Sequence, residues 1–187
     1  WDPLTANTVL MATEQGLYRS TNAGTDWTLV LPGKCTSVVH RPYSTGTPIA
    51  YAITYQTTTG VCKFYKSTDA GATWTLKSNG WWTPPAGQDT CYDIRAGRIG
   101  VSEADANKVY ALLVGYQLDG ATITTNGYLG VWRSDNAGEA WTHPHGQIGA
   151  PYAQPGHPNL MNFHGDDVAY TQLEYNTCIA VSQLDAN

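Results

Sequence analysis

The sequence has few charged residues. Only 13% of its 187 residues are Asp, Glu, Lys or Arg, about half the usual share in a soluble protein. Ten basic residues stand against fifteen acidic ones, which gives a net charge of −5, and the basic residues form no run. A protein that binds nucleic-acid phosphates needs a basic patch, so the sequence excludes that class.

Long apolar runs are missing as well, and no stretch approaches the length of a transmembrane helix. Phe is scarce, with two residues, whereas Trp and Tyr number seven and twelve. Scattered Gly and Pro argue against a helical protein, and the many aromatic residues argue against disorder. The chain begins at Trp1 without a signal peptide, so we expect a processed chain or a fragment of a longer one.

An eight-residue pattern occurs three times: STNAGTDW at 20–27, STDAGATW at 67–74 and SDNAGEAW at 134–141. Each copy follows an aromatic and a basic residue and precedes a Thr. The pattern predicts two short strands joined by a tight turn. In that turn Asn or Asp caps N–H groups with its side chain, and Gly adopts a backbone conformation that other residues resist.

This pattern resembles the Asp-box, or BNR repeat, of sialidase-like and sortilin (VPS10)-like β-propellers, including secreted bacterial proteins. The family pattern S-x-D-x-G-x-T-W matches fully in the second copy, whereas Asn22 and Asn136 replace the Asp in the other two. The resemblance implies hairpins that stabilise the fold, and calcium or sugar contact is the alternative. The residues with this structural role are Ser20, Asn22, Gly24, Trp27, Ser67, Asp69, Gly71, Trp74, Ser134, Asn136, Gly138 and Trp141.

A second repeat, in which residues 99–107 match 179–187, supports a division into units of four antiparallel strands. The innermost strand is expected at 36–40, 99–102 and 178–181, and the second at 9–12, 49–54 and 109–114. The third is expected at 17–20, 62–67 and 129–134, and the fourth begins at the Trp of each repeated turn.

Four strands per unit is typical of a propeller blade. The predicted fold is therefore all-β, a β-propeller segment of about three to four four-stranded antiparallel blades. The blades are expected at 1–33, 34–80 and 97–145, with another beginning at 177–187, and the long loops at 78–98 and 144–177. An open arc exposes sheet edges, so the expected partners include the remaining blades, in the parent chain or in other subunits.

Antiparallel order places the three repeated turns at one end of the sheets, the turn edge, and the long connections at the other, the connection edge. Loops this long are usually functional or disordered, and their aromatic residues favour function. The adjacent Trp81 and Trp82 suit a stacking platform for sugar rings, with packing in the core as the alternative. Candidate ligand-binding residues at this edge are Trp81, Trp82, Asp89, Tyr92, Asp93, Tyr152, Asp167, Glu174 and Tyr175.

All four cysteines, Cys35, Cys62, Cys91 and Cys178, are expected at the connection edge. An even number on one edge suggests disulfides and an oxidising compartment, hence a secreted or cell-surface protein. Of the three possible connectivities, Cys35–Cys62 with Cys91–Cys178 is favoured. The alternative is four free, partly buried thiols.

His143 and His145 would project to one face of an extended strand, which makes them candidates for a divalent metal. No tight ligand motif accompanies them, so we expect no metal and no cofactor. Glycoside hydrolysis needs two placed carboxylates, for which Asp93, Asp167 and Glu174 are candidates. The resembled sialidases also clamp a substrate carboxylate with three arginines, and this chain does not contain that set.

The sequence thus predicts a non-catalytic binding or surface module of a secreted or cell-surface protein, which recognises a glycan or a protein through the connection edge. One alternative is a segment of a secreted glycoside hydrolase. The other is a structural propeller that scaffolds further domains.

Overall fold

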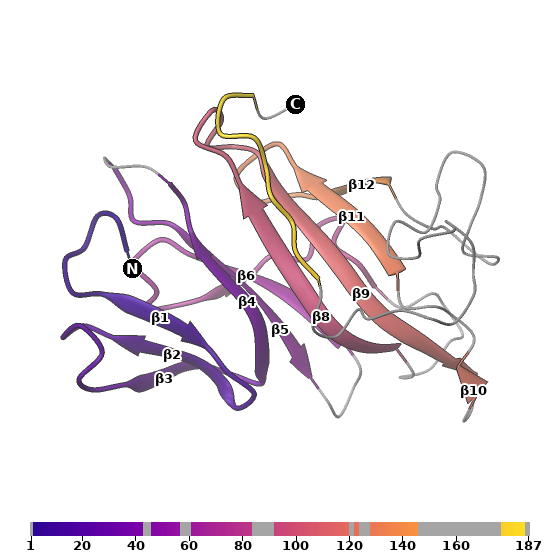
Figure 1. The fold of residues 1–187 in the computed structure, drawn as a ribbon, viewed down its shortest axis with the longest axis horizontal. Helices are drawn as coiled ribbons and strands as arrows, with labels where there is room; N and C mark the ends of the chain where they lie inside the picture. Colours follow the sequence, from indigo (N-terminus) through magenta and orange to yellow (C-terminus); the bar gives the residue numbers. More distant parts are fainter. Residues whose placement is uncertain are drawn as a thin grey trace.

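The structure is a computed structural model that describes residues 2–42, 46–56, 61–83, 92–119, 122–123, 128–145 and 177–185. For residues 92–96, 115–119, 122–123, 128–129 and 144–145 the description covers the backbone alone. Every regular element among these residues is a β-strand (Figure 1). The described residues include no helix that could span a membrane.

The strands form three antiparallel sheets. The first is β1 (Val9–Ala12), β2 (Gly16–Ser20) and β3 (Thr28–Pro32). The second is β4 (Lys34–His40), β5 (Ala50–Gln56), β6 (Val61–Ser67) and β7 (Thr75–Leu76). The third is β8 (Tyr92–Val101), β9 (Val109–Asp119), β11 (Tyr128–Ser134) and β12 (Thr142–His145), with the short β10 (Thr122–Ile123) beside the end of β9.

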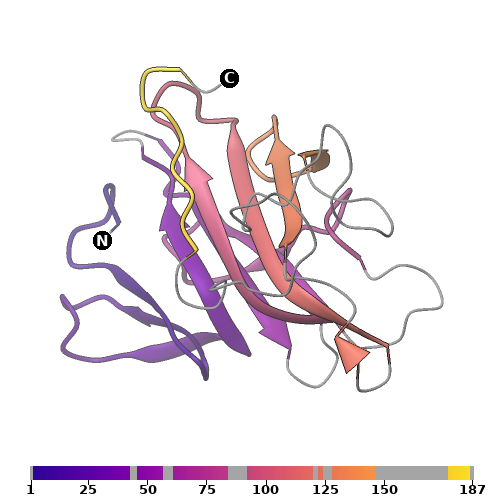
Figure 2. The ribbon, with the colours of Figure 1, turned by 45° about the vertical axis from the view of Figure 1, so that its right-hand side comes forward.

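Strand order follows chain order within each sheet, apart from β10, as in a propeller blade. The predicted all-β, propeller-like architecture is therefore confirmed. One predicted strand is not regular: residues 178–181 run alongside β8 in both views (Figures 1 and 2) but have no strand partner in the described part of the chain. A regular strand needs a neighbouring strand to pair with, and a sequence pattern does not show whether that neighbour is present.

The sheets pack face to face through two apolar clusters. Tyr51, Ile53 and Tyr55 of β5 belong to the cluster between the second and third sheets. Ala52, on the alternate face of the same strand, belongs to the cluster between the first and second sheets. Successive side chains of a strand point to opposite faces, so β5 is apolar on both faces and buried over nearly its whole length.

The three repeated turns share one hydrogen-bond pattern. In the second turn, the Ser67 hydroxyl donates to Asp69 Oδ1 at 2.8 Å and accepts from the Gly71 N–H at 2.9 Å. Asp69 Oδ1 also accepts from the Thr73 N–H at 2.9 Å. In the first and third turns the Asn side chain accepts the same bonds through its Oδ1. Because the turn needs only an acceptor oxygen there, Asn replaces Asp without loss of the pattern.

Each turn places an Ala-Gly pair in the left-handed region, with φ of 57–59° at Ala23, Ala70 and Ala137. The Ser and Asx hydrogen bonds hold a conformation that costs an L-residue about 1–2 kcal/mol. The following glycines have φ between 79° and 90°. The conformation of the alanine is therefore determined by the turn, whereas the glycine adopts this region readily.

The second and third turns pack on the preceding sheet. A Cβ added at Gly71 would lie 2.6 Å from Leu10 of β1, and one at Gly138 would lie 3.0 Å from Phe64 of β6. At Gly24 the nearest atom, 3.4 Å away, belongs to the tryptophan of the same turn. In the second and third turns the glycine therefore allows both the left-handed conformation and the close approach to the neighbouring sheet. In the first turn it allows the left-handed conformation alone.

Polar contacts join the same elements. Arg19 Nε donates to the Ala70 carbonyl at 2.8 Å. Lys66, at the equivalent position of the second sheet, reaches Glu139 at 2.8 Å, and Lys77 reaches the other carboxylate oxygen at 2.6 Å. The residue before each of the first two turns therefore contacts the next turn along the chain.

The glycine series separates conformational strain from packing. We expect Gly24→Ala to lower the free energy of unfolding by about 1–2 kcal/mol, because only the left-handed conformation is strained. Gly71→Ala and Gly138→Ala should cost about 1–3 kcal/mol more, because the added methyl also overpacks the neighbouring sheet. Urea unfolding checks this, and equal losses at all three positions would contradict the packing of the turns.

The Glu139 contacts predict a pH dependence. Hydrogen bonds from Lys66 and Lys77 hold the pKa of Glu139 below its ordinary value. The ionised Glu139 carboxylate therefore stabilises the folded protein fully above the pKa that Glu139 has in the unfolded state. This stabilisation is lost as the pH falls through the lower pKa that Glu139 has in the folded state. We expect Glu139→Gln to flatten the decline in unfolding free energy between about pH 6 and pH 3. An unchanged decline would contradict the prediction.

Candidate ligand-binding edge

The strand register places both edges of the sheets as predicted. Ser20, Ser67 and Ser134, which begin the repeated turns, pair with the first residues of β1, β5 and β9. At the opposite end, Lys34 begins β4 and Tyr92 begins β8. The connections that bring the chain into the second and third sheets therefore arrive at the connection edge.

The third sheet is longer than the second at the connection edge. β8 and β9 have 10 and 11 residues, whereas β4 and β5 have 7 each. In the added part, Tyr92 pairs with Gln117 and Asp93 with Tyr116, and the ladder shifts between Asp93 and Ala96. Two predicted ligand-binding residues, Tyr92 and Asp93, thus pair with β9 at this edge, opposite Gln117 and Tyr116.

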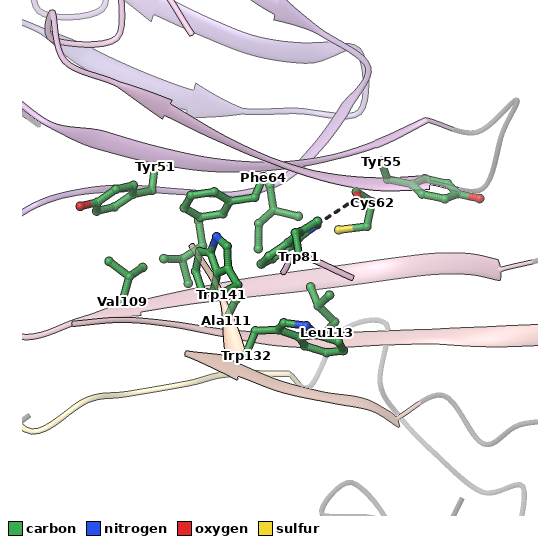
Figure 3. Close-up of a cluster of buried hydrophobic side chains, with 12 residues drawn as sticks. Tyr51, Tyr55, Cys62, Phe64, Trp81, Val109, Ala111, Leu113, Trp132 and Trp141 are labelled. Carbon is green, nitrogen blue, oxygen red and sulfur yellow. Dashed lines mark hydrogen bonds between the residues drawn. The ribbon is translucent and has the colours of Figure 1, made fainter. Parts of the chain in front are cut away.

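Trp81 is a core residue, so its assignment to a stacking platform was wrong. Its side chain is 5% exposed. The ring lies 4.8 Å from Trp141 and 5.2 Å from Phe64, and the indole N–H donates to the Cys62 carbonyl at 3.1 Å (Figure 3). A ring enclosed in this way has no face for a ligand. Trp82 is partly buried and packs against the same cluster.

A close backbone approach explains how Trp81 enters the core. The Trp141 N–H donates to the Asn79 carbonyl at 2.9 Å. A Cβ added at Gly80 would lie 2.1 Å from the Trp141 carbonyl oxygen. The chain leaves β7 after two residues, crosses to the start of β12 and inserts Trp81 between the sheets. An Asn-Gly step before an aromatic pair was the only signal of this in the sequence.

Trp141 departs from the other two turn tryptophans. Trp27 and Trp74 donate to the glycine carbonyl of their own turns at 2.9 and 3.0 Å. Trp141 lies instead in the core, 4.6 Å from Phe64 in an edge-on arrangement. Its indole N–H is buried without an acceptor among the described residues. In the third turn, the tryptophan therefore packs against Trp81 and Phe64 and does not make the hydrogen bond to the turn glycine.

The two candidate metal ligands do not form a described site. The His143 ring stacks on Trp132, with centroids 4.0 Å apart and planes inclined by 7°. His145 ends β12, and its side chain lies outside the description. Within the described ranges, no group of three His, Cys, Asp or Glu side chains comes together.

The structure contradicts the predicted disulfides. Cys35, Cys62 and Cys178 are all unpaired, and Cys91 lies outside the described residues. Cys35 pairs with Thr54 and Cys62 with Tyr55, on the two sides of β5. Two strand spacings amount to about 10 Å, beyond the reach of a disulfide. The two thiols also belong to clusters on opposite faces of the sheet.

Burial determines the chemistry of two of these thiols. It raises the pKa of Cys35 to about 12 and that of Cys62 further. Both are therefore protonated at neutral pH and poorly nucleophilic. Without the disulfides, the cysteines no longer support an oxidising compartment.

Sequence reasoning missed the role of Arg98. Its guanidinium donates to the Thr36 carbonyl at 2.7 Å, to the Gly97 carbonyl at 3.0 Å and to the Thr177 carbonyl at 3.1 Å. The side chain thereby joins β4, β8 and the segment 177–181. A residue whose acceptors are backbone carbonyls leaves no signature in a sequence.

Hydroxyl groups of β4 complete this junction. Thr36 Oγ1 accepts from the Gly97 N–H and Ser37 Oγ accepts from the Ile99 N–H, each at 3.2 Å. These bonds provide acceptors for N–H groups of β8 that are not hydrogen-bonded to β9. The innermost strands are thus fixed to one another by side chains.

The remaining predicted site residues lie outside the description. For Tyr92 and Asp93 the backbone alone is described. The residues with no described position are Asp89, Tyr152, Asp167, Glu174 and Tyr175. The structure thus brings Tyr92 and Asp93 into one ladder, moves Trp81 into the core and leaves the grouping of the others a prediction.

Comparison with known proteins gives distant structural similarity alone. No protein-family model matches the chain, and no curated protein matches it. Among solved structures, the chain is similar to the GH74 enzyme of Niastella koreensis, with 23% identity and a TM-score of 0.37. The match covers 76% of this chain and 17% of that enzyme, so this chain corresponds to about a sixth of its length.

The position of Trp81 makes a prediction about stability. We expect Trp81→Ala to lower the free energy of unfolding by about 3–5 kcal/mol, because it removes a buried ring from between two sheets. Trp82→Ala is the matched control and should cost clearly less, because that ring is only partly buried. Thermal and urea unfolding measure both, and equal losses would place the two rings in equivalent surroundings.

Proposed function

We propose that this chain is part of a glycan-binding β-propeller whose ligand lies at the connection edge of the third sheet. The extension of β8 and β9 beyond the length of the second sheet carries the proposal. A ladder is a rigid support for ligand-binding side chains, and rigid elements position such groups more accurately than loops.

The residues of the extension have the composition that a sugar site needs. Tyr92 and Tyr116 supply aromatic rings with a polar atom, and Asp93 and Gln117 supply hydrogen-bonding groups. Sugar rings combine apolar C–H faces with hydroxyl groups, so they need both kinds of partner. The low content of charged residues favours a neutral ligand. A secreted or cell-surface location suits such a ligand and remains a prediction.

The experiment measures binding to soluble polysaccharides by affinity electrophoresis. The probes are hydroxyethyl cellulose, galactomannan, laminarin and polygalacturonic acid. We expect retardation by at least one neutral polysaccharide, and a loss of affinity of about tenfold or more in Tyr92→Ala and Asp93→Asn, equivalent to about 1.4 kcal/mol. Asp26→Asn, at the turn edge, is the matched control and should bind as the unaltered chain does.

Two outcomes would contradict the proposal. The first is unaltered affinity in both Tyr92→Ala and Asp93→Asn, with folding verified by thermal unfolding. The second is release of reducing sugar that disappears in Asp93→Asn. That result would identify a hydrolytic site, because glycoside hydrolysis needs a carboxylate pair.

A further inference from the structure

The strand that begins with the predicted ligand-binding residues contains a bulge. Between the pairs Asp93–Tyr116 and Ala96–Val114, β8 advances by three residues and β9 by two. β8 therefore has one extra residue there, which the ladder leaves unpaired. Bulges redirect the residues beside them and are common next to active sites. The positions of Tyr92 and Asp93 thus depend on where this bulge is held.

β8 needs a fixed register to present these residues on the correct face. A slip of one residue moves every residue of a strand to the other face of the sheet, and Gly-rich strands are prone to it. β8 contains Gly97 and Gly100 among its 10 residues. A slip would exchange the faces on which the residues of the extension lie, so contacts that prevent a slip also determine the ligand site.

The inner strand of the second sheet, β4, has a bulge of its own at Thr36. The ladder with β5 passes from Cys35 directly to Ser37, so Thr36 is the extra residue and is free to bond elsewhere. Its hydroxyl accepts from the Gly97 N–H at 3.2 Å, and its carbonyl accepts from Arg98 Nη1 at 2.7 Å. The bulge of β4 therefore holds β8 just below the bulge of β8.

Arg98 completes this contact. The same Nη1 that donates to the Thr36 carbonyl also donates to the Gly97 carbonyl at 3.0 Å. Hydrogen bonds from a charged donor are stronger than those between neutral groups. One nitrogen thereby joins the backbones of the two bulged strands, and Gly97 is held through both its N–H and its carbonyl.

The position of Gly97 accepts no other residue of β8. A Cβ added there would lie 2.9 Å from Ile53 Cγ2 and 3.2 Å from Leu113 Cδ2. The neighbours of Gly97 in the sequence, Ala96 and Arg98, both have a Cβ. A shift of β8 by one residue in either direction would therefore force a Cβ into space that is filled by the two neighbouring strands.

We propose that Thr36, Gly97 and Arg98 form a register clamp that positions Tyr92 and Asp93 for the ligand. The clamp holds the base of the extension and does not itself touch the ligand. Gly97 follows Asp93 by four residues, a distance of roughly 10 Å along a strand that contains a bulge. This inference rests on the proposed glycan site, for which it assigns three positioning residues.

Replacement of the Thr36 hydroxyl tests the clamp, and this position is chosen because Arg98 also donates to the Thr177 carbonyl. Thr36→Val removes the acceptor of the Gly97 N–H with little change of shape, whereas Thr36→Ser keeps it. Binding is measured by affinity electrophoresis in hydroxyethyl cellulose, galactomannan and laminarin. We expect Thr36→Val to weaken binding about tenfold, the lower end of the range for groups that orient metal ligands. Thr36→Ser should bind as the unaltered chain does.

Ser37→Ala is the matched structural control. The Ser37 hydroxyl accepts from the Ile99 N–H at 3.2 Å, the same length as the bond between Gly97 and Thr36, but Ile99 lies two residues further from the bulge. Each variant leaves one N–H of β8 without its acceptor, so both should lower the melting temperature alike. Only Thr36→Val should weaken binding, and equal affinity in the two variants would overturn the inference.

A double variant separates positioning from direct contact. If Thr36 acts through the placement of Tyr92, the combination of Thr36→Val with Tyr92→Ala should weaken binding by clearly less than the product of the two single effects. Residues that act independently have additive free energies, which multiply as fold-changes. A loss equal to the full product would overturn the positioning role of Thr36.

The glycan site and the clamp fail in different ways. An unaltered chain that none of the polysaccharides retards contradicts the glycan site, and the clamp with it. A chain that is retarded, and that loses affinity in Tyr92→Ala but not in Thr36→Val, contradicts the clamp alone.

Discussion

The serine hydroxyl of each repeated turn holds an Ala-Gly pair in the left-handed region. In two of the three turns that pair is the surface that meets the preceding sheet. The local hydrogen bonds and the packing between sheets therefore depend on each other. A larger residue at the glycine would strain the turn and separate the sheets, and loss of the serine would release the turn that packs.

Most of the fold could be predicted because each copy of the repeat marks a turn between two strands. The turns, the strands beside them and the two edges follow from the spacing of Ser, Gly and Trp and from antiparallel order. The innermost strands were harder to predict, because β8 begins at Tyr92, well before the expected start at residue 99. Its length comes from pairing with β9, a partner distant in sequence.

The candidate site was less predictable. Trp81 follows an Asn-Gly step in a loop, which suggested an exposed platform, but a close approach to Trp141 directs the ring inward. Aromatic residues of cores and of binding sites have the same composition, so only contacts distinguish them. Cys35 and Cys62 share an edge but lie on opposite faces of one sheet. Edge position can be predicted from strand order, whereas this face depended on a register shift between Cys35 and Ser37.

The contacts between turns and sheets also limit the order in which the sheets can follow one another. Arg19 donates to a backbone carbonyl, which every turn possesses. Lys66 instead pairs with the carboxylate of Glu139, and the first and second turns have Thr25 and Ala72 at that position. The second sheet is therefore matched to the third turn by charge as well as by shape. Repeats that look interchangeable in sequence therefore differ in the neighbour that each one fits. Duplication or exchange of one unit would break the Lys66–Glu139 ion pair at a half-buried junction.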